Sequence, residues 1–370
     1  RKGELLDATT RQKLLALKEL RAASNAPPES DDDLVDDDSA GIPGIAKIVK
    51  ELSFQLEEDL EKFPDSYVAV VHADGNGVGK RFIDAGDRAK DLSEALTRIT
   101  SESVTAALTA VQSKQFRDPS RALPCRPIVV GGDDMTVVIA ASLALPFVHA
   151  YLRAFEQKTA AELSAFGGKM TAKAGVAFVK KHWPFSQAHD LAADLADHAK
   201  GDGSESRVAF HRVTTALARD YKSILREERR ASGGRSLTAA PYTLDQLEAL
   251  AELTQSFDRG GIPRGPVRTW VADAMRSDTE ARQRWERMRV VLSNDGKRSG
   301  AWRRFERALA AFGATKDGPW FKRPPAEEGD PPGLEITPVY DALEWKVLQP
   351  AAGCRLAAEY NKTLRSRGNA

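Results

Sequence analysis

The chain has few cysteines and no long apolar run. Its 370 residues include two cysteines, Cys125 and Cys354, which are too few and too far apart for a C-x-x-C zinc site. Two thiols in a chain of this length are typical of a protein in a reducing cytoplasm. No signal peptide, lipidation motif or apolar run of membrane-spanning length is present. We therefore expect a cytoplasmic protein with no membrane partner.

An excess of charge of one sign is also lacking. The chain has 54 Lys and Arg against 53 Asp and Glu, so its net charge gives no global attraction to nucleic acid or to membranes. Charge is uneven only locally. Residues 31–38 are aspartates around a Leu-Val pair, and they predict a solvated acidic linker after an N-terminal helix over about 7–23.

Several common catalytic motifs are absent. The glycine-rich run that follows Asp74 lacks the spacing of a P-loop, and it also misses the G-x-G-x-x-G of a dinucleotide fold. No Ser, His or Cys nucleophile stands with a recognisable base and oxyanion donor. The pair His189-Asp190 lies on a predicted helix without the other His and Asp clusters of a phosphohydrolase, so we expect it to be polar surface.

The most informative segment is a predicted hairpin at residues 127–140. Two apolar runs rich in β-branched residues flank Gly131-Gly132-Asp133-Asp134. Glycine reaches the positive φ values that short hairpin turns require, so the pattern predicts strand, turn and strand. Two adjacent carboxylates repel each other unless a cation neutralises them, and such oxygen ligands suit Mg²⁺ or Mn²⁺. The alternative is an ordinary acidic turn, because Gly and Asp are also common turn residues.

A second acidic position lies upstream of the hairpin. Residues 67–73 form a short apolar run, and Asp74 follows it at the carboxyl end of a predicted strand. If this strand pairs beside the hairpin, three carboxylates meet at one point and can hold divalent metals against a triphosphate. The glycines after Asp74 would let a phosphate approach backbone N–H groups. The alternative is a flexible strand-to-helix loop. We expect His72, just before this turn, to be structural.

The order of the predicted elements indicates one catalytic domain. We expect strands at 67–73, 126–130, 135–140, 170–179 and 208–210, and helices at 88–115, 144–165 and 186–200. The β-α-β-β-α-β order predicts an α+β fold, a ferredoxin-like palm whose antiparallel sheet carries helices on one face. A smaller all-helical domain should follow. The predicted boundaries are 1–45 for the N-terminal helix and linker, 46–225 for the palm and 226–370 for the helical domain.

The C-terminal part combines tryptophan with basic charge. Five of the six tryptophans lie beyond residue 265, and residues 259–310 hold 13 Arg or Lys against 6 Asp or Glu. One interpretation is a surface for RNA or a partner protein. The other, which we favour, is a helical core with buried tryptophans and solvated arginines. Residues 315–335, rich in Pro, Gly and charge, predict a long surface loop.

Two of these motifs resemble a known family. Ala69–Lys80 together with Gly131–Asp134 resembles the palm of GGDEF-type nucleotide cyclases, and more closely the second, GGDD-containing polymerase-cyclase palm of the large subunit of type III CRISPR effector complexes. Lys173–His211 is similar to the later strand, turn, helix and strand of that palm. Gly260–Arg264 and the helical remainder are similar to its C-terminal helical domain. The resemblance spans about 65–350.

The resemblance implies roles for individual residues. Asp74, Asp133 and Asp134 would be the catalytic metal ligands, with the Gly75 carbonyl as a further one. Lys200 would meet the nucleotide phosphates, although a lysine at a helix C-terminus is also favourable without a ligand. Met135 stands where GGDEF enzymes have Phe, so a diguanylate cyclase is not expected. The remaining positions expected around the nucleotide are Asn76, Gly77, Gly79, Gly131 and Gly132.

The implied activity is a Mg²⁺- or Mn²⁺-dependent nucleotidyltransferase. It would condense ATP or other NTPs into a cyclic oligonucleotide second messenger for antiviral defence and release pyrophosphate. The alternative is a non-catalytic CRISPR-like scaffold or ATP sensor that binds RNA or a partner protein. A template-dependent polymerase is disfavoured because no basic thumb-like groove is evident.

The implied family also predicts an incomplete catalytic unit. The chain begins with Arg1 rather than Met, which indicates a fragment, and relatives carry a first, degenerate palm before the catalytic one. A homodimer, or a complex with the missing N-terminal palm half, is therefore expected to form the active unit. An RNA or protein activator is a further expected partner.

Overall fold

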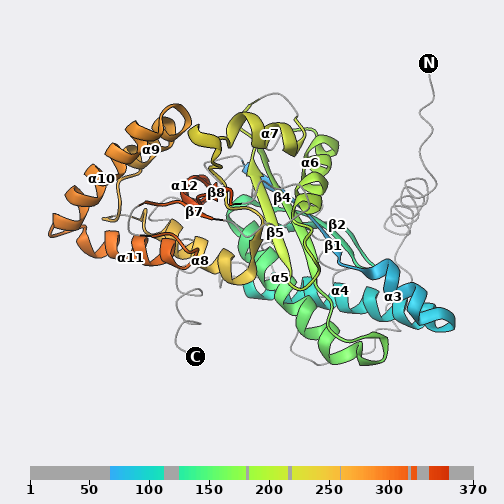
Figure 1. Ribbon diagram of the computed structural model, residues 1–370. Helices are drawn as coiled ribbons and strands as arrows, with labels where there is room; N and C mark the ends of the chain where they lie inside the picture. Colours follow the sequence, from blue (N-terminus) through green and yellow to red (C-terminus); the bar gives the residue numbers. More distant parts are fainter. Residues whose placement is uncertain are drawn as a thin grey trace, which may run out of the picture. The chain divides into compact units, whose positions relative to one another are not determined.

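The computed structural model describes residues 67–111, 125–180, 183–215, 219–258, 260–315, 318–322 and 333–349 (Figure 1). These residues fall within one compact unit. The helix predicted at 7–23, the acidic linker at 31–38 and Cys354 lie outside them. Among the described residues, no helix is long and apolar enough to cross a membrane.

A six-stranded sheet forms the centre of the palm, with the order β2-β3-β1-β4-β5-β6. Among the first four of these strands each neighbouring pair is antiparallel, which is the arrangement of a ferredoxin-like fold and confirms the predicted fold class. In the central strand β1, the four consecutive residues Val-Ala-Val-Val at 68–71 are buried. The strands are β1 Tyr67–Gly75, β2 Cys125–Gly131, β3 Asp134–Ala140, β4 Ala172–Lys180, β5 Arg207–Arg212 and β6 Tyr242–Thr243.

The fifth strand makes the sheet mixed. β5 pairs with β4 in parallel, with Gly175 opposite Ala209. The connection between them is the helix α6 (Phe185–His198), which returns the chain to the end of the sheet from which β4 started. A strand that follows such a crossover runs parallel to its predecessor. The predicted antiparallel sheet therefore gains a parallel edge.

Two helices of the palm cover one face of this sheet, and α6 packs on the other (Figure 1). α4 (Ala89–Val111) and α5 (Ala141–Glu162) pack against each other, and α4 buries an apolar stripe that includes Leu92, Leu96 and Ile99. α6 lies so close to β4 that a Cβ on Gly175 would be 1.9 Å from the Ala192 carbonyl oxygen. Only glycine allows this approach of helix to strand.

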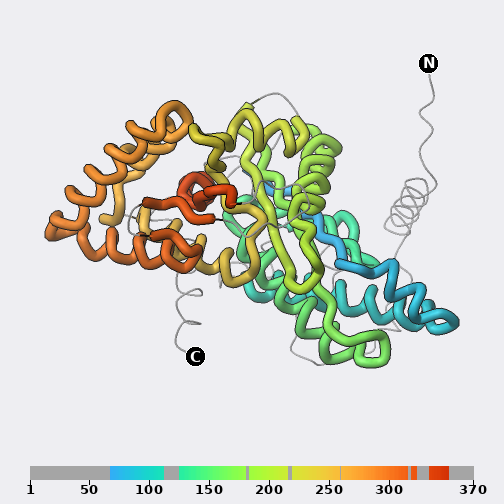
Figure 2. The backbone as a smooth tube through the Cα atoms, viewed as in Figure 1, coloured from blue at the N-terminus to red at the C-terminus, as the bar shows by residue number. Residues whose placement is uncertain are grey.

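The remaining elements follow the palm and form a mostly helical region (Figure 2). Helix α3 lies earlier, between β1 and α4. The bounds are α3 Val78–Ala85, α7 Tyr221–Glu228, α8 Leu244–Gln255, α9 Arg264–Arg276, α10 Asp278–Asn294, α11 Ser299–Ala310, α12 Val339–Leu348, β7 Phe321–Lys322 and β8 Glu335–Ile336. Short 3₁₀ turns occur at Gly86–Arg88, Ser164–Phe166 and Ser232–Gly234. The loop predicted at 315–335 contains the pair β7–β8, and its residues 323–332 lie outside the described part.

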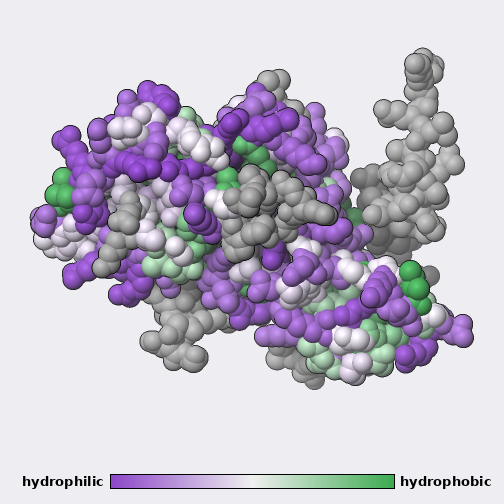
Figure 3. All heavy atoms as spheres, in the orientation of Figure 1, coloured by the Kyte–Doolittle hydropathy of each residue, from purple (hydrophilic) through white to green (hydrophobic). Residues whose placement is uncertain are grey.

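Tryptophans form the core of the helical region. Trp270, Trp285 and Trp302 are buried, with ring centroids 5.5 Å apart for the first two and 5.6 Å for the last two. The face of this region in view in Figure 3 is largely hydrophilic. The structure thus confirms the interpretation of these tryptophans as core residues.

Helix α12 is held to the palm by charged side chains. Arg212 of β5 donates two hydrogen bonds to the Glu344 carboxylate, at 2.6 and 3.0 Å. One helical turn away, the fully buried Asp341 lies 3.6 Å from the equally buried Arg229. Burial makes such pairs costly to break. Of these two contacts, the Arg212–Glu344 pair joins the predicted palm to the predicted helical domain. The predicted boundary at residues 225/226 remains a prediction.

Candidate functional site

The hairpin turn stands at the edge of the sheet where β1 ends. Gly131 pairs with Asp134, so Gly132 and Asp133 form a two-residue turn in which Gly132 has φ 60°. Such a φ favours glycine, which explains the residue at this position.

Helix α4 holds the turn from one side. The Thr100 hydroxyl donates to the Gly132 carbonyl at 2.6 Å, and the Gly132 N–H donates to the Thr97 hydroxyl at 3.1 Å. Both partners lie more than thirty residues upstream in the chain. The turn is therefore fixed in place by tertiary contacts as well as by its own sequence.

The structure brings Asp74, Asp133 and Asp134 together. One carboxylate oxygen from each lies within 4.8 Å of the others, and all three side chains are partly buried. A Cβ at Gly75 would be 3.0 Å from the Asp133 Cβ and 2.6 Å from Val78 Cγ2, so the glycine leaves room for the turn to approach β1. Three carboxylates at this spacing match the oxygen ligands that Mg²⁺ and Mn²⁺ prefer. Among the described residues this is the only such cluster.

The three carboxylates disturb one another. The pKa of Asp133 is raised to about 6, mainly by burial and also by the negative charges of Asp134 and Asp74, against a backbone hydrogen bond that lowers it. Like charges at short range disfavour ionisation of all three groups together. The cluster is thus a poor arrangement for the metal-free protein and a good one for binding a cation.

This raised pKa makes the metal-free protein sensitive to pH. The folded state holds the Asp133 proton up to about pH 6, whereas the unfolded chain releases it near its ordinary value of 3.8. The associated stability is fully present below the lower value and is lost as the pH rises through the upper one. We expect Asp133→Asn, which cannot ionise, to become more stable relative to the parent protein across this interval when a chelator is present.

Paired urea denaturation curves at about pH 4 and about pH 7.5 would measure the gain. Asp245→Asn is a suitable control, because Asp245 is exposed at the start of α8 and should show no such change. A gain for Asp133→Asn that is the same at both pH values would contradict the expectation.

A lysine that the sequence analysis did not select pairs with one carboxylate of the triad. Lys173 of β4 pairs in register with Asp74 of β1, and its Nζ lies 3.3 Å from Asp74 Oδ2. The same Nζ lies 2.6 Å from Asp197 Oδ1 on α6. The signal in the sequence was a single cation within an apolar strand, Ala172–Val179, but only the sheet register shows which carboxylate it meets.

The glycine-rich segment after Asp74 is tied to two other loops. The Asn76 N–H donates to the Thr171 carbonyl at 2.9 Å, and its side-chain amide donates to the Thr171 hydroxyl at 2.9 Å. That hydroxyl donates in turn to the Gly203 carbonyl at 2.8 Å. Gly77 has φ 70° and precedes α3, in which Gly79 is exposed. The segment is held in position and still presents exposed glycine backbone.

Arg81, which the sequence analysis also passed over, fixes the start of α3. Its guanidinium donates to the carbonyls of Phe166, Gly168 and Lys169, at 2.7, 2.9 and 2.7 Å. These three carbonyls belong to the loop that leads into β4. Arg81 therefore joins the segment that follows Asp74 to the loop that precedes Lys173.

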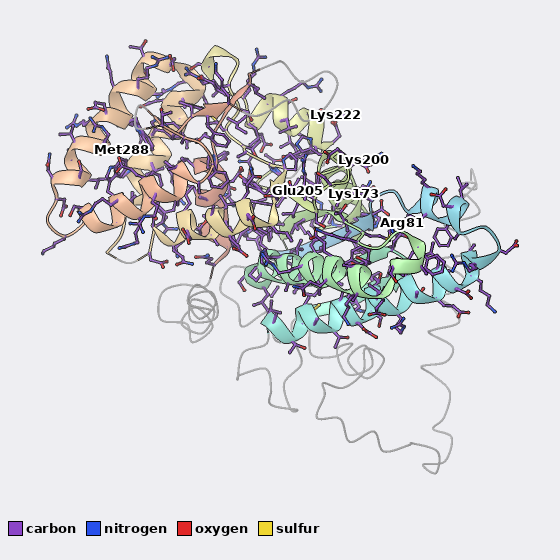
Figure 4. The ribbon with its side chains drawn as sticks, turned by 60° about the horizontal axis from the view of Figure 1, so that its bottom comes forward. Arg81, Lys173, Lys200, Glu205, Lys222 and Met288 are labelled. Carbon is purple, nitrogen blue, oxygen red and sulfur yellow. The ribbon has the colours of Figure 1, made fainter. Side chains whose placement is uncertain are left out.

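Lys200, the predicted phosphate contact, lies just after α6 and is exposed (Figure 4). Its N–H donates to the Asp197 carbonyl at 3.2 Å, so the residue follows directly on the turn of α6 that carries the Lys173 partner. Its role with phosphate remains a prediction. The same holds for the metal-ligand roles of the carboxylates and of the Gly75 carbonyl, and for Gly131 and Gly132.

The histidines near the site make protein contacts. His72 Nδ1 lies 3.1 Å from the Thr136 hydroxyl, and its ring is 5.4 Å from that of His189. Asp190 is largely exposed.

Cys125 is buried and unpaired, and burial raises its pKa to about 12, so it is not a reactive thiol at neutral pH.

The comparison with protein families identifies the palm. Residues 67–209 match the family model described as Cas10/Cmr2, second palm domain. Over this segment the chain is similar to the second palm of Cas10/Cmr2. The Asp triad, the hairpin turn and Lys200 all lie inside the matched palm. A comparison with curated protein sequences gave no match.

Solved structures similar to this chain include three that contain Csm1. The Csm1–Csm4 cassette in complex with cA3 is 16% identical, with a TM-score of 0.41, and the match covers 62% of this chain and 31% of that chain. The cassette in complex with pppApA is 17% identical, with a TM-score of 0.42, and the match covers 79% of this chain and 37% of that chain. Csm1 in T. onnurineus is 17% identical, with a TM-score of 0.34, and the match covers 63% of this chain and 33% of that chain. The chain therefore spans about a third of the length of these structures.

Proposed function

We propose that the chain is a metal-dependent nucleotidyltransferase that condenses ATP into a cyclic oligonucleotide second messenger. The observation that carries the proposal is the meeting of Asp74, Asp133 and Asp134 within 4.8 Å of one another in a segment that matches the Cas10/Cmr2 palm. The choice of ATP, and a role in antiviral defence in the cytoplasm, follow from that family and are part of the proposal.

The proposed reaction is a nucleotidyl transfer. The 3′-oxygen of one nucleotide forms a bond to the α-phosphorus of another, the bond from that phosphorus to the pyrophosphate oxygen breaks, and the hydroxyl proton passes to water. Mg²⁺ or Mn²⁺ held by the three carboxylates would lower the pKa of the attacking hydroxyl and offset charge on the phosphate oxygens. The contacts from Thr97 and Thr100 to Gly132 keep the hairpin carboxylates in position before substrate binds.

The proposed phosphate site lies beside the carboxylates. The exposed backbone N–H groups of Gly77 and Gly79 would donate hydrogen bonds to the nucleotide phosphates, because no side chain stands in the way. Lys200 would supply a cation to the same phosphates. Asn76 contributes by holding this segment against Thr171, through the hydrogen bonds described above.

The proposed active unit contains a second palm. One palm offers one carboxylate triad, and condensation needs a donor and an acceptor nucleotide at the same time. We propose that a second copy of this chain, or an N-terminal palm half, supplies the other nucleotide. An RNA or protein activator would control the joining of the two.

The test is incubation of the purified chain with each NTP and Mg²⁺ or Mn²⁺, followed by mass spectrometry of the products. We expect linear or cyclic oligonucleotides from ATP, and none when a chelator is present. Metal-dependent ATP binding without any product would instead support the sensor or scaffold function. Neither binding nor product, with the chain alone or mixed with a candidate partner palm, would overturn the proposal.

A further inference from the structure

A lysine ammonium is built into the carboxylate cluster. Lys173 projects from β4 beside Asp74, with its Nζ 3.3 Å from Asp74 Oδ2 and 2.6 Å from Asp197 Oδ1. Only 12% of its side chain is exposed, whereas the Asp197 side chain is 75% exposed. The ammonium therefore lies between a member of the triad on its inner side and a solvated carboxylate on its outer side.

Its position in the strand is costly. Ala172 and Ala174 on either side of it are fully buried, as is most of β4. A cation in such a place is stable only when carboxylates pair with it. Since the triad carries three neighbouring carboxylates, the lysine also offsets part of their mutual repulsion in the metal-free protein. The contact therefore stabilises both the Lys173 ammonium and the triad carboxylates, and it forms without a bound nucleotide.

We infer that Lys173 is an internal counter-cation of the triad, which competes with the divalent metal for Asp74 and stays paired with Asp197 once the metal is bound. The inference rests on the proposed metal site. A divalent cation on Asp74 would lie a few Å from the ammonium, where the repulsion between them is substantial even in a solvated site. Because Asp197 already accepts from Lys173, the lysine is not left as an unpaired buried charge when Asp74 turns to the metal.

The consequence is a metal affinity set below its maximum. An ammonium that partly neutralises the triad lowers its attraction for Mg²⁺ or Mn²⁺, and it also keeps the metal-free carboxylates from moving apart. Removing the ammonium should therefore have two opposite effects, with tighter metal binding and a less stable metal-free protein. A lysine that served only to pack or to orient Asp74 would weaken metal binding when removed.

The experiment is a calorimetric titration of the full chain with Mn²⁺ in the absence of nucleotide. We expect Lys173→Met to bind Mn²⁺ about tenfold more tightly than the parent protein, and to melt at a lower temperature in EDTA. Lys173→Arg keeps the charge and should stay within about twofold of the parent affinity. The matched control is Lys169→Met, because Lys169 pairs with Glu156 outside the triad and should leave the affinity unchanged.

Each outcome decides the inference. Mn²⁺ binding by Lys173→Met that equals or is weaker than that of the parent would overturn it, while leaving the proposed function intact. No Mn²⁺ binding by the parent protein would remove the metal site, and the proposed function with it. If Lys173→Met does not fold, Lys173→Met with Asp197→Asn is compared with Asp197→Asn alone. The double variant must bind Mn²⁺ more tightly, and equal affinities would reject the counter-cation.

Discussion

Replacing Asp133 and Asp134 together by alanine is expected to lower nucleotide synthesis by at least about a thousandfold. The two residues supply two of the three carboxylates in the cluster, and the one left, Asp74, is paired with Lys173. A single carboxylate so neutralised cannot hold a divalent cation against a triphosphate. Product formed per hour, measured by mass spectrometry, gives the loss.

The same double variant should be more stable than the parent protein when no metal is present. It removes partly buried carboxylates, and burial together with their mutual repulsion raises the pKa of Asp133. Thermal melting in EDTA measures this effect, and added Mn²⁺ should raise the melting temperature of the parent protein but not of the variant. Loss of synthesis together with higher metal-free stability would separate a missing ligand from a misfolded protein.

Asp245→Ala is the matched control for the double variant, because it removes an exposed carboxylate at the start of α8. It should leave synthesis and melting unchanged. If the Asp133→Ala, Asp134→Ala protein still made product at a rate near that of the parent, the triad would not be the catalytic centre.

Replacing Asp341 by alanine should destabilise the protein by about 3–5 kcal/mol. Asp341 is fully buried at the start of α12, and its Oδ2 accepts from the Thr238 hydroxyl at 2.7 Å, the Ala239 N–H at 3.0 Å and the Tyr242 hydroxyl. Its Oδ1 lies 3.6 Å from the buried Arg229 guanidinium. The substitution leaves that cation and three donors without their acceptor. Urea denaturation measures the change.

The partner residue provides a control for this cost. Arg229→Met combined with Asp341→Leu replaces the buried pair by apolar side chains and leaves no lone charge, so it should cost less than Asp341→Ala alone. Arg289→Ala, which removes one end of an exposed pair with Glu286 within α10, should cost below about 1 kcal/mol. A cost of less than about 1 kcal/mol for Asp341→Ala would show that the buried contacts of this carboxylate contribute little to the stability of the fold.

Local patterns in the sequence were enough to predict most of the palm. The hairpin could be read from Gly131 and Gly132 between β-branched runs, since turn chemistry and strand propensity act over a few residues. The α4 stripe could be read from its helical spacing, and the observed helix ends within a few residues of the predicted bounds. The parallel β5 and the position of α6 on the opposite face could not, because neither depends on local spacing.

The sequence by itself determined which residues are candidates for metal binding. They are three aspartates placed after a strand or in a tight turn, next to glycines that leave room for a ligand. Only the tertiary structure decided how they meet. The β1–β3 and β1–β4 registers bring Asp74 to the hairpin and set Lys173 beside it, and α6 adds Asp197 from the other side. These contacts join segments far apart in the chain. Charge balance at the site depends on distances across the sheet, which no pattern of neighbouring residues contains.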